Sequence, residues 1–313
     1  MNIITIKSPL RISLIGGSSD LDTYLDKYKR GSVISFTPNL FTYISIYNDF
    51  LGINSLNKKY IINYSTREEV KTIDCIKNDL VRLAFKNENI EPCSIHMTSD
   101  IYSHGSGLAV SSSYSCGLIK ALNVLKNNEI TEIECGINAY KLEKQINPLL
   151  GYQDIFGCCY GGFKKIVFES EKLPVFTFLP SKIFKLFDMY LYFTGSFRNS
   201  TDILKDVIVP ETDTFNPLVK IAEDLLLSEK YYDFMSIIRD GWNEKKKNCK
   251  TILSNPKLLE IDNILSEMKD CVAHKLCGAG GGGFFFCFVN KGTKLSNEFH
   301  KIELSNNNIE RII

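Results

Sequence analysis

The alternation of apolar and polar positions divides the first half of the chain into strands and helices. Residues 10–16 and 31–47 are rich in β-branched and aromatic side chains, which is typical of strands. Residues 74–87 instead place apolar side chains at helical spacing. The same reasoning predicts, in chain order, a strand at 93–101, a loop that opens a helix at 103–126, helices at 131–146 and 151–161, and a strand at 162–169.

The pattern restarts near residue 170, which predicts a second domain. The expected elements there are a strand at 189–195, amphipathic helices near 215–228, 231–250 and 257–270, and two strands around the glycine cluster 278–283. We therefore predict domains at residues 1–170 and 171–313. Strands and helices alternate irregularly and long stretches look antiparallel, so the expected fold class is α+β rather than a doubly wound parallel sheet.

Composition narrows the functional classes. The net charge of +1 over 313 residues argues against a nucleic-acid partner, although small anions remain open because local sites hold them. No apolar stretch has the length of a membrane helix and the N-terminus lacks the pattern of a signal peptide, so we expect a cytoplasmic protein without a membrane partner. The ten cysteines contain no C-x-x-C pair and the four histidines share no ligand spacing, so we expect reduced, mostly buried thiols and no histidine-held metal.

Two glycine-rich stretches are candidate phosphate loops. The segment GAGGGG at 278–283 satisfies G-x-G-x-x-G, but a strand follows it, whereas the dinucleotide motif requires a helix. This turn either gathers N–H groups around an anion or lets another segment pack closely against it. In the second stretch Gly105 and Gly107 precede Ser111, Ser112 and Ser113 at a helix start, which suits phosphate, or the serines are ordinary N-caps.

A third stretch, SPLRISLIGGSSDLDTY at 8–24, completes an ordered set of motifs. Together the three stretches resemble the blocks P-x-R-(apolar)-G-x-x-x-D, G-x-G-L-G-S-S and G-A-G-G-G-G of the GHMP family of small-molecule kinases. The likeness covers nearly the whole chain. Three further segments are similar to the branch of the family that acts on D-glycero-D-manno-heptose 7-phosphate: GYQDIFGCCYGGFKKIVF, LYFTGSFRNSTDIL and RDGWNEKKK. The resemblance implies two α+β domains with nucleotide and sugar in the cleft between them, and a glycine turn that lies against the active-site loops.

The resemblance also implies roles for individual residues. Asp154 matches the catalytic aspartate and Arg11 the basic residue beside it, while Ser111 and Glu143 match the Mg²⁺ ligands. Without the family, Asp154 reads as a helix N-terminal acid, Glu143 as a solvated helix face and Arg11 as a surface residue. The nucleotide-binding set implied is Gly105, Ser106, Gly107, Leu108, Ser111, Ser112 and Ser113. The substrate-binding set implied is Gly16, Gly17, Ser18, Asp20, Gln153, Arg198, Gly278, Ala279, Gly280 and Gly281.

The chain departs from the pattern in the second block. Ala109 and Val110 stand where the family has Gly-Ser, so a weaker affinity for ATP or a non-catalytic sensor of the same fold are both open. His104 replaces a common proline and reads as a loop residue without a chemical role. Arg198 and Lys245 to Lys247 are candidates to hold a substrate's own phosphate, or the lysines are a solvated helix face.

The activity implied is an ATP- and Mg²⁺-dependent kinase for the anomeric hydroxyl of a sugar phosphate. D-glycero-D-manno-heptose 7-phosphate is the expected acceptor, with another sugar such as fucose as the alternative. The partners expected are therefore small molecules, a sugar phosphate and a nucleotide. The sequence leaves the oligomeric state open.

Overall fold

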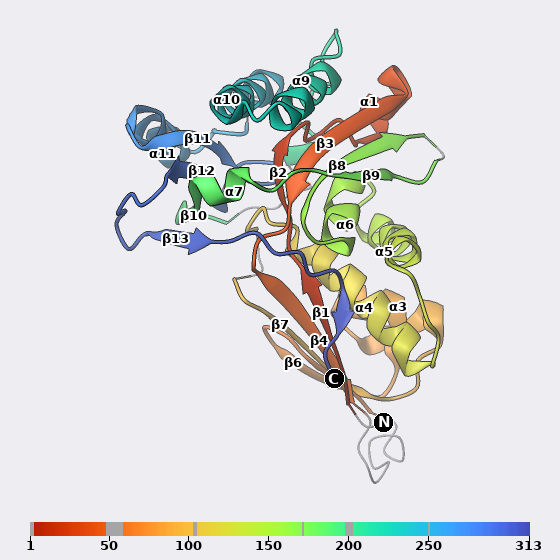
Figure 1. The fold of residues 1–313 in the computed structure, drawn as a ribbon. Coiled ribbons are helices and arrows are strands. Elements are labelled where there is room, and N and C mark those ends of the chain that lie inside the picture. The colour runs from red at the N-terminus through yellow and green to blue at the C-terminus, as the bar shows by residue number, and fades with distance from the viewer. Residues whose placement is uncertain (1–2, 48–58, 103–104, 171, 198–202, 250) are drawn as a thin grey trace.

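The computed structural model describes residues 3–47, 59–102, 105–170, 172–197, 203–249 and 251–313. Within these residues the strands form three sheets, and helices cover them (Figure 1). Nearly all strand pairs are antiparallel, and the β5·β7 pair is the parallel one among those described. Sheets covered by helices in this irregular order match the predicted α+β class.

The first sheet and its helices form the N-terminal half of the core. In spatial order its strands are β14 (Glu310–Arg311), β1 (Ile3–Pro9), β4 (Phe41–Tyr47), β7 (Ser94–Ser99), β5 (Tyr60–Asn63) and β6 (Arg67–Val70). The helices beside it are η1 (Ile73–Cys75), α3 (Asp79–Glu88), α4 (Val110–Leu125), α5 (Glu132–Ile146) and α6 (Tyr152–Cys159). Helix α4 lies directly on β1 and β4 and also contacts α5 and α6, so it fixes the helices that carry the site.

The second sheet combines strands from both predicted domains, and the third lies wholly in the C-terminal half. The second sheet has the order β2 (Ile12–Ile15), β3 (Arg30–Phe36), β8 (Phe163–Glu169) and β9 (Val175–Phe178), and α1 (Asp22–Tyr28) packs beside it. The third has the order β11 (Cys271–Leu276), β12 (Phe284–Asn290), β10 (Phe187–Phe193) and β13 (Phe299–Ile302). The remaining helices are α7 (Ile183–Leu186), α9 (Phe215–Leu227), α10 (Tyr231–Asn248) and α11 (Pro256–Glu267). Helix α10 contacts both β2 and β11, so it bridges the second and third sheets.

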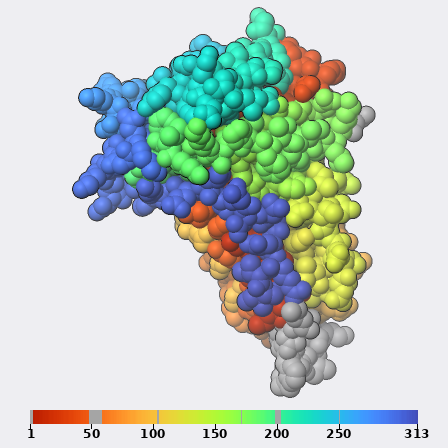
Figure 2. Space-filling model, viewed as in Figure 1, coloured from red at the N-terminus to blue at the C-terminus, as the bar shows by residue number. Residues whose placement is uncertain are grey.

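The C-terminal segment returns to the first sheet. Strand β14 pairs with β1, with Ile6 opposite Arg311. Figure 2 shows this last part of the chain, in blue, running down the face toward the narrow end, and Figure 1 places both labelled termini there. The division at residue 170 stays a prediction, and the structure adds that the end of the chain joins the first sheet.

Most predicted elements are present, with shifted ends. The expected helix at 74–87 begins at Asp79, because the Asn78 side chain accepts from the Val81 N–H and caps the helix there. Helix α1 and strands β1, β5, β6, β9, β13 and β14 were not predicted, since each is short or lacks a clear period. All ten cysteines are free, and eight of them are buried. No helix in the described part of the chain is long and apolar enough to span a membrane.

Candidate active site

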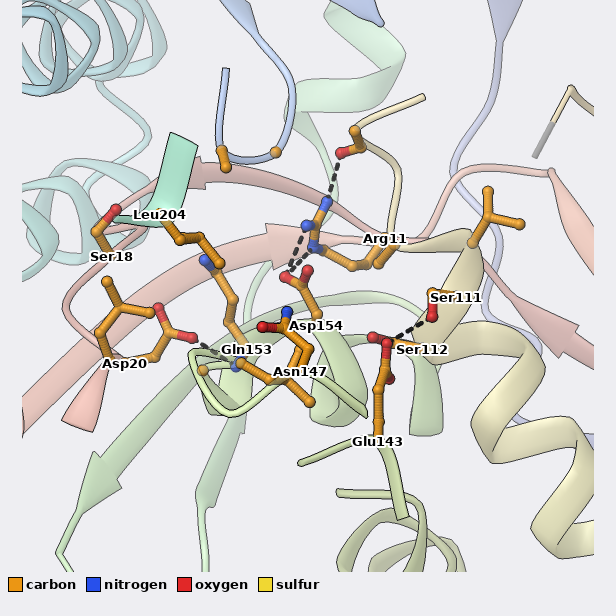
Figure 3. A pocket seen from close by; sticks show the side chains of 18 of the residues that line it. Arg11, Ser18, Asp20, Ser111, Ser112, Glu143, Asn147, Gln153, Asp154 and Leu204 are labelled. Carbon is orange, nitrogen blue, oxygen red and sulfur yellow. Dashed lines mark hydrogen bonds and ion pairs between the residues drawn. The ribbon is translucent and has the colours of Figure 1, made fainter. Parts of the chain in front are cut away.

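A cavity of about 410 Å³ lies between four segments: the loop before α4, the start of α6, the loop before α1 and the glycine turn. Figure 3 shows its lining side chains pointing toward one another. The predicted residues that line it are Arg11, Ser18, Asp20, Gly105, Ser106, Gly107, Ser111, Ser112, Glu143, Gln153, Asp154, Gly278 and Ala279. Residues from all three blocks therefore meet in one place.

Arg11 and Asp154 form an ion pair at the centre of the cavity. Arg11 Nε and Nη2 donate to Asp154 Oδ1 at 3.0 and 2.6 Å, and Nη1 donates to the Gly107 carbonyl oxygen at 2.9 Å. Arg11 is 2% exposed, so the reading of it as a surface residue is wrong. Burial alone would lower the pKa of Arg11, but the Asp154 carboxylate outweighs burial and raises it, so the guanidinium stays charged.

Asp154 owes its position to the first turn of α6. Its side chain is 30% exposed and faces the cavity (Figure 3). Gly157, one turn later, lets the helix approach the arginine, because a Cβ there would lie 3.0 Å from Arg11 Cγ. The helix terminus and the buried cation both favour a carboxylate at this position.

Glu143 and Ser111 form a second polar pair, which joins α5 to α4. Ser111 Oγ donates to Glu143 Oε1 at 2.6 Å (Figure 3). Ser115 Oγ donates to Glu143 Oε2 at 3.2 Å. Glu143 is 5% exposed, so its interpretation as a solvated helix face is wrong. Burial raises the pKa of the Glu143 carboxyl, although the serine hydroxyls that donate to it oppose the shift. Within the described residues no three His, Cys, Asp or Glu side chains gather as a metal site.

Asp20 and Gln153 line the opposite end of the cavity. Asp20 Oδ2 accepts from the Gln153 N–H at 2.9 Å, while Asp20 Oδ1 and Gln153 Oε1 are buried and have no hydrogen-bond partner. Burial raises the pKa of Asp20 to about 6, against the pull of that N–H. Two buried acceptors without partners suit a ligand that brings hydroxyl donors.

The glycine turn packs closely against the loop that precedes α4. The Phe284 N–H donates to the Ser106 carbonyl oxygen at 3.2 Å. A Cβ on Gly107 would lie 2.5 Å from the Cys277 carbonyl oxygen, and a Cβ on Gly283 would lie 2.3 Å from the Ser106 carbonyl oxygen. Both glycines also have positive φ. The sequence left two roles open for this turn, anion binding and close packing of another segment, and the structure shows the close packing.

Six predicted site residues do not line the cavity: Gly16, Gly17, Leu108, Ser113, Gly280 and Gly281. Leu108 is fully buried in the core, and Ser113 Oγ donates to the Ser8 carbonyl oxygen at 3.0 Å, so its hydroxyl fastens α4 to β1. Gly16 has a φ of +83° and a Cβ there would lie 2.1 Å from the Ser32 carbonyl oxygen, so it shapes the loop from behind. Arg198 and His104 lie outside the described residues.

Several residues of the site were missed. Asn147, Leu204 and Gly151 line the cavity, and a Cβ on Gly151 would lie 2.1 Å from Asp20 Oδ2. Ser13 does not line the cavity, but its hydroxyl is buried without a partner, and a Cβ on Gly17 would lie 3.3 Å from it. Gly151, two residues before Gln153, was the one available signal for a close approach.

Ala109, which replaces a family glycine, keeps a glycine-like backbone. It precedes α4 with φ 60° and ψ 38°, the left-handed region, and its carbonyl oxygen accepts the Ser113 N–H at 2.9 Å. A left-handed conformation costs a residue with a Cβ about 1–2 kcal/mol. The chain thus holds Ala109 in a conformation that suits glycine at the expense of local strain.

Ala109→Gly is expected to stabilise the protein. The substitution removes the left-handed strain of about 1–2 kcal/mol and adds about 0.5–1 kcal/mol of unfolded-state entropy, so the net gain is about 0.5–1 kcal/mol. Thermal unfolding of the variant and the parent protein measures it. Ala121→Gly, at an ordinary position within α4, is the control and should destabilise. A loss of stability in Ala109→Gly would contradict the inference that the left-handed conformation of Ala109 is strained.

Comparison with known proteins gives this geometry its context. The family described as GHMP kinases N terminal domain matches residues 70–162. The chain is 29% identical over 315 residues to D-glycero-alpha-D-manno-heptose 7-phosphate kinase of Campylobacter jejuni, which covers 94% of this chain and 91% of that protein. The chain thus matches the GHMP kinase family over residues 70–162, and its similarity to the heptose kinase extends over nearly its whole length. It is a phosphotransferase with a hydroxyl acceptor.

Solved structures agree on the GHMP kinase fold. A D-glycero-D-manno-heptose 1-phosphate kinase from Bacteroides thetaiotaomicron superposes with a TM-score of 0.75 at 20% identity, covering 98% of each chain. Lactococcus lactis galactokinase, complexed with galactose, superposes with a TM-score of 0.73 at 15% identity, covering 98% of this chain and 95% of that one. The predicted fold class is therefore confirmed.

Proposed function

We propose that the protein is an ATP- and Mg²⁺-dependent kinase that phosphorylates the anomeric hydroxyl of D-glycero-D-manno-heptose 7-phosphate. The observation that carries the proposal is the meeting of two polar pairs, Arg11–Asp154 and Ser111–Glu143, in one cavity at the start of α4. The similarity to the Campylobacter jejuni heptose 7-phosphate kinase supports the choice of acceptor.

In this proposal Asp154 accepts the proton of the attacking hydroxyl, and Arg11 neutralises charge between acceptor and phosphoryl group. The Asp154 carboxylate is partly exposed to the cavity, so a hydroxyl has access to it. Phosphoryl transfer passes through a loose transition state, so orientation of the hydroxyl and placement of charge matter more than basicity. A guanidinium that stays charged at all working pH values suits the second role.

The phosphate end of the cavity fits a nucleotide with its metal ion. The free N–H groups at the start of α4 and the dipole of a 16-residue helix attract phosphate. One carboxylate and one hydroxyl, Glu143 and Ser111, are a donor set that Mg²⁺ accepts when phosphates and water supply the other ligands. The buried Glu143 carboxylate, whose pKa burial raises, gains from a cation beside it. When bound, the ion supplies charge neutralisation on the phosphates.

The sugar end of the cavity is assigned to Asp20, Gln153 and Ser18. The orphaned oxygens Asp20 Oδ1 and Gln153 Oε1 would accept hydrogen bonds from sugar hydroxyls, and their burial makes these bonds selective. An acceptor that lacks such donors would leave both oxygens unsatisfied, which costs binding energy.

Asp20 is expected to give kcat/KM for the sugar an acidic limb near pH 6. Burial raises its pKa to about 6, and below that value the protonated carboxyl accepts fewer hydroxyl donors. Asp20→Asn should lower kcat/KM about 10- to 100-fold, because charged hydrogen bonds are lost, and should flatten that limb. The sugar's own phosphate titrates near pH 6 in both proteins, so the ratio of the two profiles isolates Asp20. A ratio independent of pH would contradict the assignment.

The same shift predicts how stability depends on pH. The folded state binds more protons than the unfolded state between about pH 4 and pH 6, because the Asp20 pKa is raised on folding. The contribution of Asp20 to the free energy of unfolding therefore falls as pH rises through this window, and Asp20→Asn should remove that decline.

The proposed activity is tested directly with purified protein, Mg-ATP and a panel of sugars and sugar phosphates, followed by phosphorus NMR. The expected product is an anomeric phosphate from D-glycero-D-manno-heptose 7-phosphate and from few other acceptors. Turnover of fucose or galactose alone would replace the heptose proposal, and the absence of an anomeric phosphate from every acceptor would refute the kinase activity.

Ala109 and Val110 depart from the Gly-Ser of the second family block, and this departure favours one alternative function: a sensor that binds sugar without turnover. The retained left-handed backbone at Ala109 argues for a functional loop, because N–H donors do not depend on the side chain. Calorimetry separates the two: binding of the sugar phosphate without measurable Mg-ATP binding would favour the sensor.

A further inference from the structure

The cavity wall from the C-terminal half of the chain carries one buried lysine. Lys245, near the end of α10, is 8% exposed and lines the cavity together with Gly278, Ala279 and Leu204. Its ammonium group donates to the Gly278 carbonyl oxygen in the glycine turn. The aliphatic part of the Lys245 side chain is thus packed in protein, while its ammonium group lies at the cavity wall.

The other two lysines of the same run have different surroundings. Lys246 Nζ lies 2.9 Å from Asp262 Oδ2, and Lys247, which is 70% exposed, pairs with Glu244 at 2.6 Å. The sequence interpretation of the run as a solvated face therefore holds for Lys247 and is wrong for Lys245.

Three carboxylates, Asp20, Glu143 and Asp154, also line the cavity, and the case for an anion is local to Lys245, which has a second buried lysine near it. Among the described residues that line the cavity, Arg11 and Lys245 are the cations, and Arg11 is committed to Asp154 and to the Gly107 carbonyl oxygen. Lys275 lies behind the wall, is 5% exposed, and donates to the Leu14 carbonyl oxygen at 3.1 Å. Burial first, and the neighbouring Lys245 charge second, lower the pKa of Lys275 to about 7. An anion beside Lys245 would offset this repulsion between like charges.

We propose that Lys245 and the turn Gly278–Ala279 form a phosphoryl-binding subsite on the C-terminal wall of the cavity. The subsite rests on the proposed function in one respect: its occupant is a phosphoryl group of a substrate. Two sources have this chemistry, the phosphate at the far end of the sugar and the terminal phosphate of the nucleotide. An ammonium fixed on a glycine turn is a point charge that suits phosphoryl oxygens from either source.

Direct binding measurements test the subsite without any turnover. Inorganic phosphate and Mg-ATP are titrated by calorimetry into the parent protein and into Lys245→Met, Lys245→Arg and Lys247→Met. We expect Lys245→Met to weaken phosphate binding about 10- to 100-fold, as the loss of a charged hydrogen bond does. Lys245→Arg should stay within a few-fold of the parent, and Lys247→Met, the matched control on the same helix, should be unchanged. If Lys245→Met does not fold, Lys245→Gln replaces it with the same expected loss.

Steady-state kinetics distinguish the two sources. A rise in KM for the heptose 7-phosphate alone assigns the subsite to the far-end phosphate, and a rise in KM for ATP alone assigns it to the nucleotide. Unchanged phosphate binding in a folded Lys245→Met or Lys245→Gln would overturn the subsite and leave Lys245 as a tie between α10 and the turn. Should the protein turn over no sugar, the phosphate titration still decides the subsite, so the two failures are separable.

Discussion

Asp154→Asn is expected to lower kcat about 10²- to 10⁴-fold while the affinity for Mg-ATP stays within about threefold, because a proton acceptor contributes this much and the proposed function assigns the nucleotide contacts to other residues. The amide keeps the size of the side chain and still accepts a hydrogen bond from Arg11, so the cavity should keep its shape. Single-turnover kinetics measure the chemical step, and calorimetry measures nucleotide binding.

The same substitution removes the charge that partners a buried guanidinium. Arg11 is 2% exposed but Asp154 is 30% exposed, so solvent screens part of the loss, and we expect about 1–2 kcal/mol of destabilisation rather than the larger cost of a fully buried pair. Assays therefore belong well below the unfolding temperature. Asp22→Asn is the matched control, since Asp22 is 52% exposed and pairs with Lys144 at 2.7 Å on the surface. Near-normal kcat in Asp154→Asn would show that another group accepts the proton.

The blocks that were predictable from sequence are those whose backbone has a special shape. Gly107 and Gly283 have positive φ and no room for a Cβ, and clustered glycines reveal such places in any sequence. The helix starts that carry Ser111 and Asp154 were also predictable, since helical periodicity begins directly after each loop. Joining the blocks into one cavity required the resemblance to a family, because no local pattern relates residue 11 to residue 154.

What sequence reasoning missed depends on burial and on contacts between distant segments. Glu143 and Lys245 both lie in polar helical stretches that predict solvent exposure, yet each is held inside by a neighbour from elsewhere in the chain, Ser111 and Gly278 respectively. Ser13, whose hydroxyl is buried without a partner, is an ordinary residue of strand β2, and only the approach of Gly17 distinguishes it. Single-sequence patterns report periodicity and turn chemistry, and they carry no signal for such pairings.

The clustered glycines are expected to be required for contact between the glycine turn and the loop that precedes α4. Gly283→Ala tests this expectation. Gly283 has a φ of +90°, and its Cβ would lie 2.3 Å from the Ser106 carbonyl oxygen, a backbone atom that yields only if the loop moves. Gly292→Ala is a matched control, because Gly292 has a φ of +81° and a Cβ there would meet nothing within 4 Å. Both variants carry the left-handed strain of about 1–2 kcal/mol, and only Gly283→Ala adds the clash.

We therefore expect Gly292→Ala to lose about 1–2 kcal/mol of stability with kcat/KM for ATP within twofold of the parent. Gly283→Ala should displace Ser106 and Gly107 and lower kcat/KM for ATP by about 10²-fold, since small misplacements at a phosphate site carry costs of this order. General destabilisation lowers the unfolding temperature without changing KM in the folded protein, so the kinetic difference between the two variants reports the loop alone. Equal kinetics in the two variants would mean that the loop before α4 keeps its shape when its contact with the glycine turn is disturbed.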